Sequence, residues 1–178
     1  WDIKQRIGYV SPELHLYFLR GKGIFNTIPG LEKSLPSGGN SLKCNEVITS
    51  GFNEQVGFSI SHSDFQRKAV KTWFSILQLE HLADSKFADA SLSEQRLLLL
   101  ARALVKLPSL LNLDEPCQGL DAHQTRRFTG MLDVICRHLD TTVIYVTHYT
   151  EEIPQSVTQL LHLENGQVKY CGDFVRLR

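Results

Sequence analysis

The sequence contains Leu110-Leu111-Asn112-Leu113-Asp114-Glu115-Pro116, a mostly apolar run that ends in two consecutive carboxylates. A short apolar run closed by a turn residue indicates a buried strand, with Asp114 and Glu115 at its carboxyl end. Burying adjacent carboxylates costs free energy unless a metal ion, a proton or a cation compensates them. The alternative is a strand that ends in a solvated acidic turn, which we would prefer for an isolated Asp-Glu pair. The residues downstream favour a chemical site instead.

The downstream residues predict a second strand beside the first. Gly119-Leu120-Asp121 precedes a helix expected from about Ala122 to Leu139, and Asp121 is placed to cap it. The β-branched segment from Thr142 to Thr147 has the composition of a central strand, and His148 follows it. Because parallel strands in an α/β sheet bind ligands beyond their carboxyl ends, we expect the carboxylates and His148 at one edge.

The rest of the chain predicts strands and helices around this edge. Ile7 to Val10 indicates a short strand, and Asp64 is expected to cap a helix through Gln78. Ser93 precedes a segment from Glu94 to Lys106 that is apolar on nearly every side, which predicts a helix buried against a sheet. A short helix is expected near 151–155. Two apolar runs around Glu164-Asn165-Gly166 predict a hairpin over 160–170.

Composition narrows the class of protein. Among the 178 residues, 19 Lys and Arg balance 19 Asp and Glu, so no net charge attracts nucleic acid or an anionic membrane over a long range. The four cysteines form no C-x-x-C pair, which argues against a zinc site or a disulfide framework and favours a reducing cytoplasm. The longest apolar run, 97–104, is too short to span a bilayer, and we expect no signal peptide and no membrane segment.

Four motifs in this order and spacing resemble the ATP-binding cassette (ABC) ATPases. Leu110 to Pro116 matches that family's Walker B motif, Gly119 to Asp121 its D-loop and His148 its switch histidine. Leu92-Ser93 with the helix that follows looks like its signature motif. Within the family, Arg102 to Lys106 and Gln118 to Asp121 are most similar to the second cassette of molybdate-transport-type, or photorepair, ATP-binding proteins. The resemblance is strong from about Glu46 onward, moderate over residues 1–17 and absent from about 18 to 43.

The resemblance implies a fold and a division of the chain. The fold would be α/β, a P-loop NTPase-like and mostly parallel sheet with flanking helices, plus a helical signature subdomain. Residues 1–17 would start the core, and 18–43 would form an irregular insertion. Residues 44–93 would form the helical subdomain that ends in the signature motif. Residues 94–178 would complete the ATPase core with the C-terminal hairpin.

The resemblance also implies roles for single residues, with ATP and Mg²⁺ as cofactors. Asp114 would hold the Mg²⁺ ion, and Glu115 would orient or deprotonate the attacking water. His148 would contact the γ-phosphate. Ser93, with Glu94 in the same motif, would contact the γ-phosphate of a nucleotide held by the opposite cassette, at the amino end of the helix. Asp121 would lie at that interface, which is compatible with its role as a helix cap.

The family implies a head-to-tail pair of cassettes, as a homodimer or in tandem. The pair would couple ATP hydrolysis to a membrane permease that imports molybdate or a related anion, at the inner face of the cell membrane. A soluble tandem ATPase in regulation or DNA repair is the other form, although nothing in the sequence supports direct binding to nucleic acid. A degenerate cassette that only dimerises or regulates is the non-enzymatic alternative. A metal-using enzyme without nucleotide would leave the spacing of Ser93, Gly119 and His148 unexplained.

The sequence departs from the family pattern at several positions. It contains no G-x-x-x-x-G-K-[ST] loop, so we expect the phosphate-gripping part of the family to precede Trp1, and Lys33 to be an ordinary loop lysine. The signature lacks the glycine-containing pair after Ser93, and Ser11-Pro12-Glu13 replaces the expected glutamine. Asn112 stands at a strand position that is usually apolar, so it needs a hydrogen-bond partner if it is buried. The six histidines other than His148, among them His62, His123 and His138, are expected at the surface.

Overall fold

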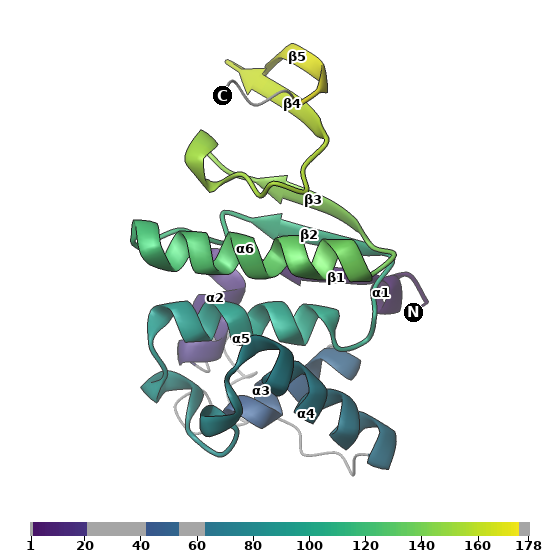
Figure 1. Cartoon of the computed structure of the whole chain (residues 1–178), viewed down its shortest axis with the longest axis vertical. Coiled ribbons are helices and arrows are strands. Elements are labelled where there is room, and N and C mark those ends of the chain that lie inside the picture. Colours follow the sequence, from purple (N-terminus) through teal and green to yellow (C-terminus); the bar gives the residue numbers. More distant parts are fainter. Residues whose placement is uncertain (1, 21–41, 54–62, 175–178) are drawn as a thin grey trace, which may run out of the picture.

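The computed structural model describes residues 2–20, 42–53 and 63–174. Its centre is a parallel sheet of three strands in the order β1-β2-β3, with β1 at Ile7–Val10, β2 at Leu110–Asp114 and β3 at Thr142–Val146 (Figure 1). In this register Tyr9 lies beside Asn112, which lies beside Ile144. The predicted strands and the α/β class are therefore confirmed.

Two helices, one before β2 and one between β2 and β3 in the chain, cover one face of the sheet. Helix α5 spans Leu92–Leu104, and helix α6 spans Ala122–His138 (Figure 1). The strand residues that point toward the helices, among them Leu111 and Leu113, are fully buried. The opposite face of the sheet is more open, with Ile144 48% exposed. Parallel sheets normally carry a layer on both faces. In this sheet, the described residues cover one face.

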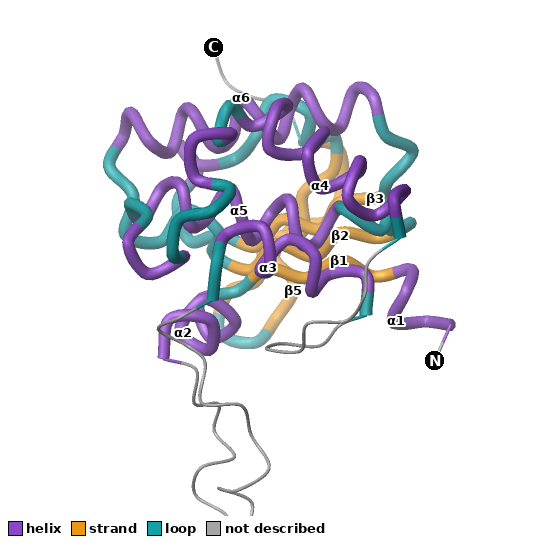
Figure 2. Tube along the Cα trace, turned by 90° about the horizontal axis from the view of Figure 1, so that it is seen from below, coloured by secondary structure: helices purple, strands orange, loops and turns teal. Residues whose placement is uncertain are grey.

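Helix α5 is buried on all sides, as its composition predicts. All residues from Gln95 to Leu104 are buried. Its second side faces a layer of further helices and 3-10 turns, which lie over the strands in the view from below (Figure 2). They are α2 at Pro12–Arg20, α3 at Cys44–Thr49, η3 at Ser50–Phe52, α4 at Asp64–Leu77, η4 at Glu80–Leu82 and η5 at Phe87–Asp89.

Gly51 allows the closest approach of this layer to α5. A Cβ atom built on Gly51 would lie 2.0 Å from the carbonyl oxygen of Arg102. Only a residue without a side chain fits between the two backbones at this point. The tight packing of η3 on the end of α5 therefore depends on a glycine.

Two helix starts differ from the prediction, for the same reason. Helix α4 is capped by Ser63 and not by Asp64: the Ser63 hydroxyl accepts the amide of Gln66, whose side chain accepts the amide of Ser63. Helix α5 begins at Leu92 with Ser91 as its cap, so Ser93 lies inside the helix and does not precede it. In both helices a Ser-x-x-Gln or Ser-x-x-Glu capping box sets the first turn.

The predicted insertion over 18–43 is wrong at its edges. Phe18, Leu19 and Arg20 belong to α2, and Phe18 is completely buried. At the other edge, Lys43 pairs with Lys86 in an isolated bridge. Residues 21–41, including Lys33, lie outside the described residues, as does His62.

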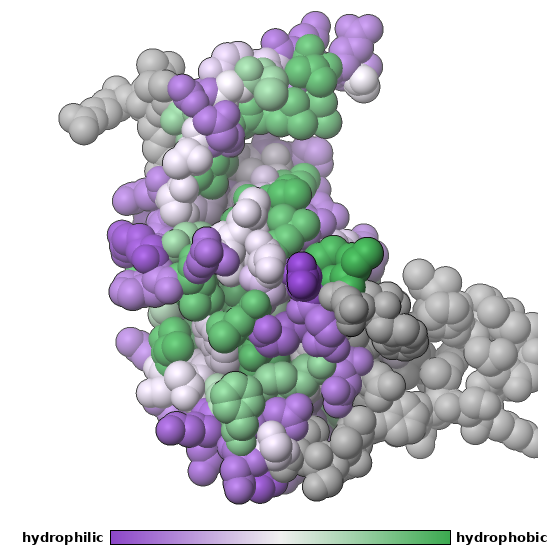
Figure 3. All heavy atoms as spheres, turned by 90° about the vertical axis from the view of Figure 1, so that its right-hand side faces the viewer, coloured by the Kyte–Doolittle hydropathy of each residue, from purple (hydrophilic) through white to green (hydrophobic). Residues whose placement is uncertain are grey.

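The C-terminal part forms the expected hairpin. Strand β4 (Gln159–Glu164) pairs antiparallel with β5 (Gln167–Asp173) through Asn165 and Gly166, whose φ angles are 50° and 73°. Two successive positive φ angles give the turn that best matches strand twist. The hairpin stands away from the parallel sheet and exposes apolar side chains (Figures 1 and 3).

Short helices complete the described chain. Helix α1 covers Asp2–Arg6, and the short helix expected near 151–155 is a single 3-10 turn, η6, at Thr150–Glu152. The loop after it is fastened by Asp133, which is buried on α6 and accepts the amides of Gln155 (3.1 Å) and Ser156 (2.8 Å). Among the described helices, none is both long enough and apolar enough to cross a membrane.

Candidate functional site

Glu115 and His148 meet at the carboxyl edge of the sheet. The Nε2 atom of His148 lies 3.0 Å from Oε1 of Glu115. Asp114 pairs with Val146 in the last register position of β2 and β3, and the Glu115 amide donates to the carbonyl of Val146 at 2.9 Å. The adjacent strands therefore hold an acid and a histidine within hydrogen-bond distance. Both are accessible, since the Glu115 side chain is 27% exposed and that of His148 is 78% exposed.

The loop that follows β3 is fastened by its own side chains. The Thr147 hydroxyl donates to Oε2 of Glu152 at 2.8 Å and accepts the amide of Tyr149 at 3.1 Å. These bonds fix the backbone on either side of His148. The imidazole itself stays open to solvent, which is what contact with a bound substrate requires.

Asp114 ends β2 and lies half-buried on the open face of the sheet. In the described part of the chain, no group of three or more His, Cys, Asp or Glu side chains could hold a metal ion by itself. Mg²⁺ at phosphate sites is bound by one or two carboxylates together with phosphate oxygens and water. Asp114 therefore fits a magnesium ion that arrives with a nucleotide, and it does not fit a metal site made of protein alone.

The loop from Glu115 to Leu120 is tightly bent. Glu115 has a φ angle of 42° and Gly119 of 83°, so a non-glycine residue adopts the left-handed region at the candidate catalytic position. The amide of Gln118 donates to the Glu115 carbonyl at 3.1 Å, and that of Leu120 to the Cys117 carbonyl at 3.0 Å. Left-handed backbone at such a residue costs about 1–3 kcal/mol and persists only where the surroundings enforce it.

Cys117 anchors the buried side of this loop. Its sulfur lies 3.3 Å from the hydroxyl of Tyr145 on β3. Burial raises the pKa of the Cys117 thiol to about 11 and also raises the pKa of the Tyr145 phenol. Both groups are thus neutral at pH 7. They form an uncharged support behind Glu115, with no sign of a reactive thiolate.

Asp121 caps α6, as the sequence predicts. Its carboxylate accepts the amides of His123 and Gln124, each at 2.8 Å, and Gln124 accepts the Asp121 amide at 3.1 Å. Asp121 is exposed at the surface. Its capping role is therefore established, and its contact with a second cassette stays a prediction.

The amino end of α5 is occupied by its own side chains. The Glu94 carboxylate accepts the Ser91 amide at 2.8 Å and the Ser91 hydroxyl at 2.6 Å, and Ser93 lies 3.4 Å from that hydroxyl. His81 lies 3.4 Å from the same carboxylate. Burial alone would raise the pKa of Glu94, but the hydrogen bonds and His81 lower it overall. A fixed negative charge therefore stands where the resemblance expects a phosphate.

The structure brings some predicted site residues together and leaves others apart. Leu92, at the start of α5, packs against the loop after β2, since a Cβ atom built on Gly119 would lie 3.2 Å from its side chain. No hydrogen bond or ion pair between the described side chains joins Ser93 or Glu94 to Glu115 or His148. At the end of β1, Ser11 caps α2 by accepting the Leu14 amide at 3.2 Å, which leaves Glu13 exposed in the first turn.

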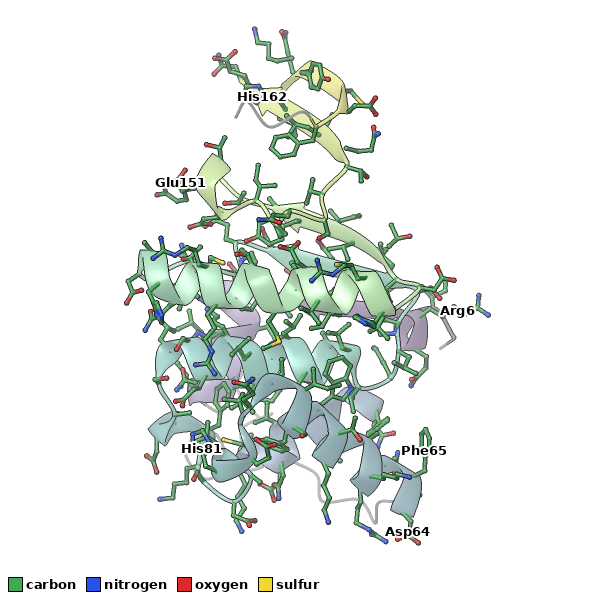
Figure 4. The ribbon with its side chains drawn as sticks, viewed as in Figure 1. Arg6, Asp64, Phe65, His81, Glu151 and His162 are labelled. Atoms are coloured by element: carbon green, nitrogen blue, oxygen red, sulfur yellow. The ribbon has the colours of Figure 1, made fainter. Side chains whose placement is uncertain are left out.

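His15 corrects the prediction that the remaining histidines lie at the surface. It is 5% exposed, and its Nε2 lies 2.7 Å from Oε1 of Gln95. Burial lowers the pKa of His15, so the ring is neutral at pH 7. The spacing of apolar residues in α2 could have placed it in the core. His81 and His162 lie near opposite ends of the molecule (Figure 4).

Two further polar residues lie in the interior without full partners. Asn112 is half-buried on the open face of the sheet, and its Oδ1 has no hydrogen-bond partner among the described residues, although a partner was expected. Arg96 on α5 is 3% exposed. The sequence marked Asn112 as a polar residue in an apolar strand, whereas no sequence motif marked Arg96 as buried.

Comparison with known proteins identifies the family. No family model matches the chain. It is 35% identical over 173 residues to the ABC transporter ATP-binding protein ModF of Escherichia coli strain K12, a match covering 96% of this chain and 31% of ModF. It is 34% identical over 120 residues to the molybdenum import ATP-binding protein ModC of the same organism, covering 67% of this chain and 33% of ModC. The chain belongs to the ABC ATPases. The family expected from the motifs is thereby confirmed.

Solved structures of cassettes share the fold. CbiO1 from Clostridium perfringens, part of the ABC transporter complex CbiONQ, gives a TM-score of 0.69 at 22% identity, covering 97% of this chain and 59% of CbiO1. A putative metal-chelate type ABC transporter in an inward-facing conformation gives 0.69 at 19% identity, covering 94% of this chain and 58% of that one. The chain thus corresponds to part of a cassette, and it spans about a third of ModF and of ModC.

Proposed function

We propose that this cassette supplies the hydrolytic edge of an ATPase site, with Glu115 acting on the attacking water. The carrying observation is the 3.0 Å contact between Glu115 and His148 at the ends of β2 and β3. A carboxylate that accepts a proton from water in the transition state contributes about 10²–10⁴ in rate. Glu115 is placed for that role because it is accessible and its backbone is fixed by the Val146 carbonyl.

The residues around Glu115 have complementary roles in this proposal. Asp114 would hold the Mg²⁺ ion, which neutralises charge on the phosphates when it is bound with ATP. His148 orients the Glu115 carboxylate through Nε2 and, being exposed, can contact the terminal phosphate. The proton of the water passes to the Glu115 carboxylate as the water oxygen attacks the γ-phosphorus, and the bond between the γ-phosphorus and the bridging oxygen breaks to release ADP. Cys117 and Tyr145, both neutral, leave Glu115 as the proton acceptor in this loop.

The experiment compares two glutamate variants of the protein as it is encoded. Glu115→Gln keeps the size of the side chain and removes its basicity, so we expect kcat for ATP to fall about 10²-fold or more. Glu151→Gln is the matched control, since Glu151 is exposed on η6 (Figure 4) and is neither of the two residues in this contact. Equal activity of wild type and Glu115→Gln would refute the role of Glu115.

A degenerate cassette that binds a partner without hydrolysis is the second candidate, and one observation favours it. The Glu94 carboxylate occupies the amino end of α5, where the family places a phosphate of the opposite nucleotide. Two anions at one helix end repel each other, so this half of a composite site would bind nucleotide weakly. Equilibrium dialysis with millimolar Mg-ATP separates the candidates: no binding by the encoded protein supports the degenerate cassette.

We further propose a second cassette as partner, in a head-to-tail pair that places Asp121 at the interface. The names of ModF and ModC connect these relatives with an ABC transporter and with molybdenum import, which favours a cytoplasmic ATPase acting on a permease for an oxyanion. Co-purification of a membrane permease would support transport. ATP-dependent binding to DNA would support a soluble role in repair.

A further inference from the structure

Arg96 is a buried cation without an acidic partner among the described residues. It is 3% exposed, and its Nη2 donates to the carbonyl of Gln118 at 3.1 Å. Nε and Nη1 have no hydrogen-bond partner, and no ion pair involves the guanidinium, within the residues that the structure describes. A guanidinium buried without a counter-ion costs free energy, so stability alone does not explain why it stands here.

The bond from Arg96 reaches the loop that carries Glu115. Gln118 donates its own amide to the Glu115 carbonyl, so the peptide held by Arg96 is joined to the strained residue. Leu92, four residues before Arg96 on α5, also packs against Gly119 in this loop. Arg96 is thus the polar contact between α5 and the middle of the loop. Gln118 itself is exposed, so this part of the loop has little other packing.

We propose that Arg96 is a positioning residue for Glu115. Through the Gln118 carbonyl, it clamps the loop from Glu115 to Leu120 in the bent conformation that holds the carboxylate beside His148. The catalytic part of this inference rests on the proposed function of Glu115. The clamp itself does not, and it is measured separately.

Cysteine labelling of the chain tests the clamp. Cys117 lies in the loop and Cys44 lies on α3; both are buried, and burial raises the pKa of each thiol to about 11. Cys44 therefore reports global opening, and Cys117 reports opening of the loop as well. In Arg96→Met, we expect labelling of Cys117 to accelerate by roughly tenfold to a hundredfold, the equivalent of one lost hydrogen bond from a charged donor. Labelling of Cys44 stays within about twofold.

Two comparisons separate a clamp from a general structural role. Arg102→Met removes the other buried arginine of α5, which donates to Ser50 Oγ at 3.0 Å beside α3. This variant should accelerate the labelling of Cys44, and it should not accelerate the labelling of Cys117 more than that of Cys44. The urea midpoint of Arg96→Met should equal or exceed that of wild type, because an apolar side chain replaces an unpaired buried charge. Arg96→Lys, which retains a cationic donor, should label Cys117 at an intermediate rate.

The kinetic arm uses the protein as it is encoded. Displacement of Glu115 should lower kcat for ATP by roughly tenfold to a hundredfold, with KM within about twofold, because orientation and not binding is lost. Equal acceleration of Cys44 and Cys117 in Arg96→Met, or unchanged labelling of Cys117, would overturn the clamp. Selective labelling with an unchanged kcat would overturn the positioning role. If the wild type does not hydrolyse ATP, the proposed function fails while the labelling result still decides the clamp.

Discussion

Replacement of Gln95 by leucine should destabilise the fold far more than a surface substitution of the same kind. The Gln95 amide donates to the carbonyls of Phe87 at 3.0 Å and Ala90 at 2.9 Å, and its Oε1 lies 2.7 Å from His15 Nε2. Since the amide nitrogen faces two carbonyls, Oε1 is the acceptor, so Nε2 of His15 carries the proton. One side chain thus joins α5 to α2 and η5.

The magnitude follows from the groups that lose their partners. In Gln95→Leu, His15 Nε2 and the Ala90 carbonyl become unpaired, whereas the Phe87 carbonyl keeps the Ala90 amide at 3.3 Å. A buried polar group without a partner costs about 1–3 kcal/mol, so the free energy of unfolding should fall by about 2–6 kcal/mol. For a chain of this size that lowers Tm by roughly 4–24 °C.

Urea denaturation followed by circular dichroism measures this loss. Gln118→Leu is the matched control, because Gln118 is exposed and should change the free energy of unfolding by about 0.5 kcal/mol or less. A double variant with His15→Phe should recover part of the loss, since it removes one of the unpaired groups. A loss below about 1 kcal/mol for Gln95→Leu would refute the reasoning, because the three contacts would then contribute nothing net.

Further predictions concern pH and the glycines. Burial lowers the pKa of His15 below its ordinary 6.5, so just below pH 6.5 the unfolded chain binds more protons than the folded chain. The free energy of unfolding therefore falls as the pH falls from 6.5. His15→Gln should flatten this decline in urea titrations from about pH 7 to 5. Gly51→Ala should destabilise by about 3 kcal/mol or more, because the new Cβ meets the Arg102 backbone, and a loss under 1 kcal/mol in denaturation would contradict this. Gly130→Ala in α6, where a Cβ meets open space, should raise stability by about 0.5–1 kcal/mol, and any fall in Tm would contradict it.

The residues that meet at the carboxyl edge of the sheet could be predicted, because local sequence patterns indicate where each strand ends. The apolar run before Asp114, the β-branched segment before His148 and the helix between them predict parallel neighbours, and the register confirms that they meet. Glu115 and His148 could therefore be paired without coordinates. The capping of α6 by Asp121 was equally local, because a cap and its helix are adjacent in sequence.

Long-range polar contacts could not be predicted in this way. His15 and Gln95 are 80 positions apart, and Arg96 meets Gln118 across 22. Each of these residues by itself looks like an ordinary polar side chain, because burial is decided by the elements that pack around it. Ser91 was missed although the sequence carries a signal for it: Glu94 follows Ser91 by three residues, which is the capping-box pattern, whereas Arg96 follows Ser93 by three.

The neighbours Gln95 and Arg96 show how one helix links the described parts of the cassette. Successive residues of a helix point about 100° apart, so two adjacent polar side chains face different elements. Gln95 faces the helical layer through His15 and Phe87, and Arg96 faces the loop of Glu115 through Gln118. A rotation or shift of α5 would change both contacts together. The amino end of α5 is also the end that the family resemblance places against an opposite cassette, and the labelling and kinetic experiments measure the link that runs from α5 through Arg96 to Glu115.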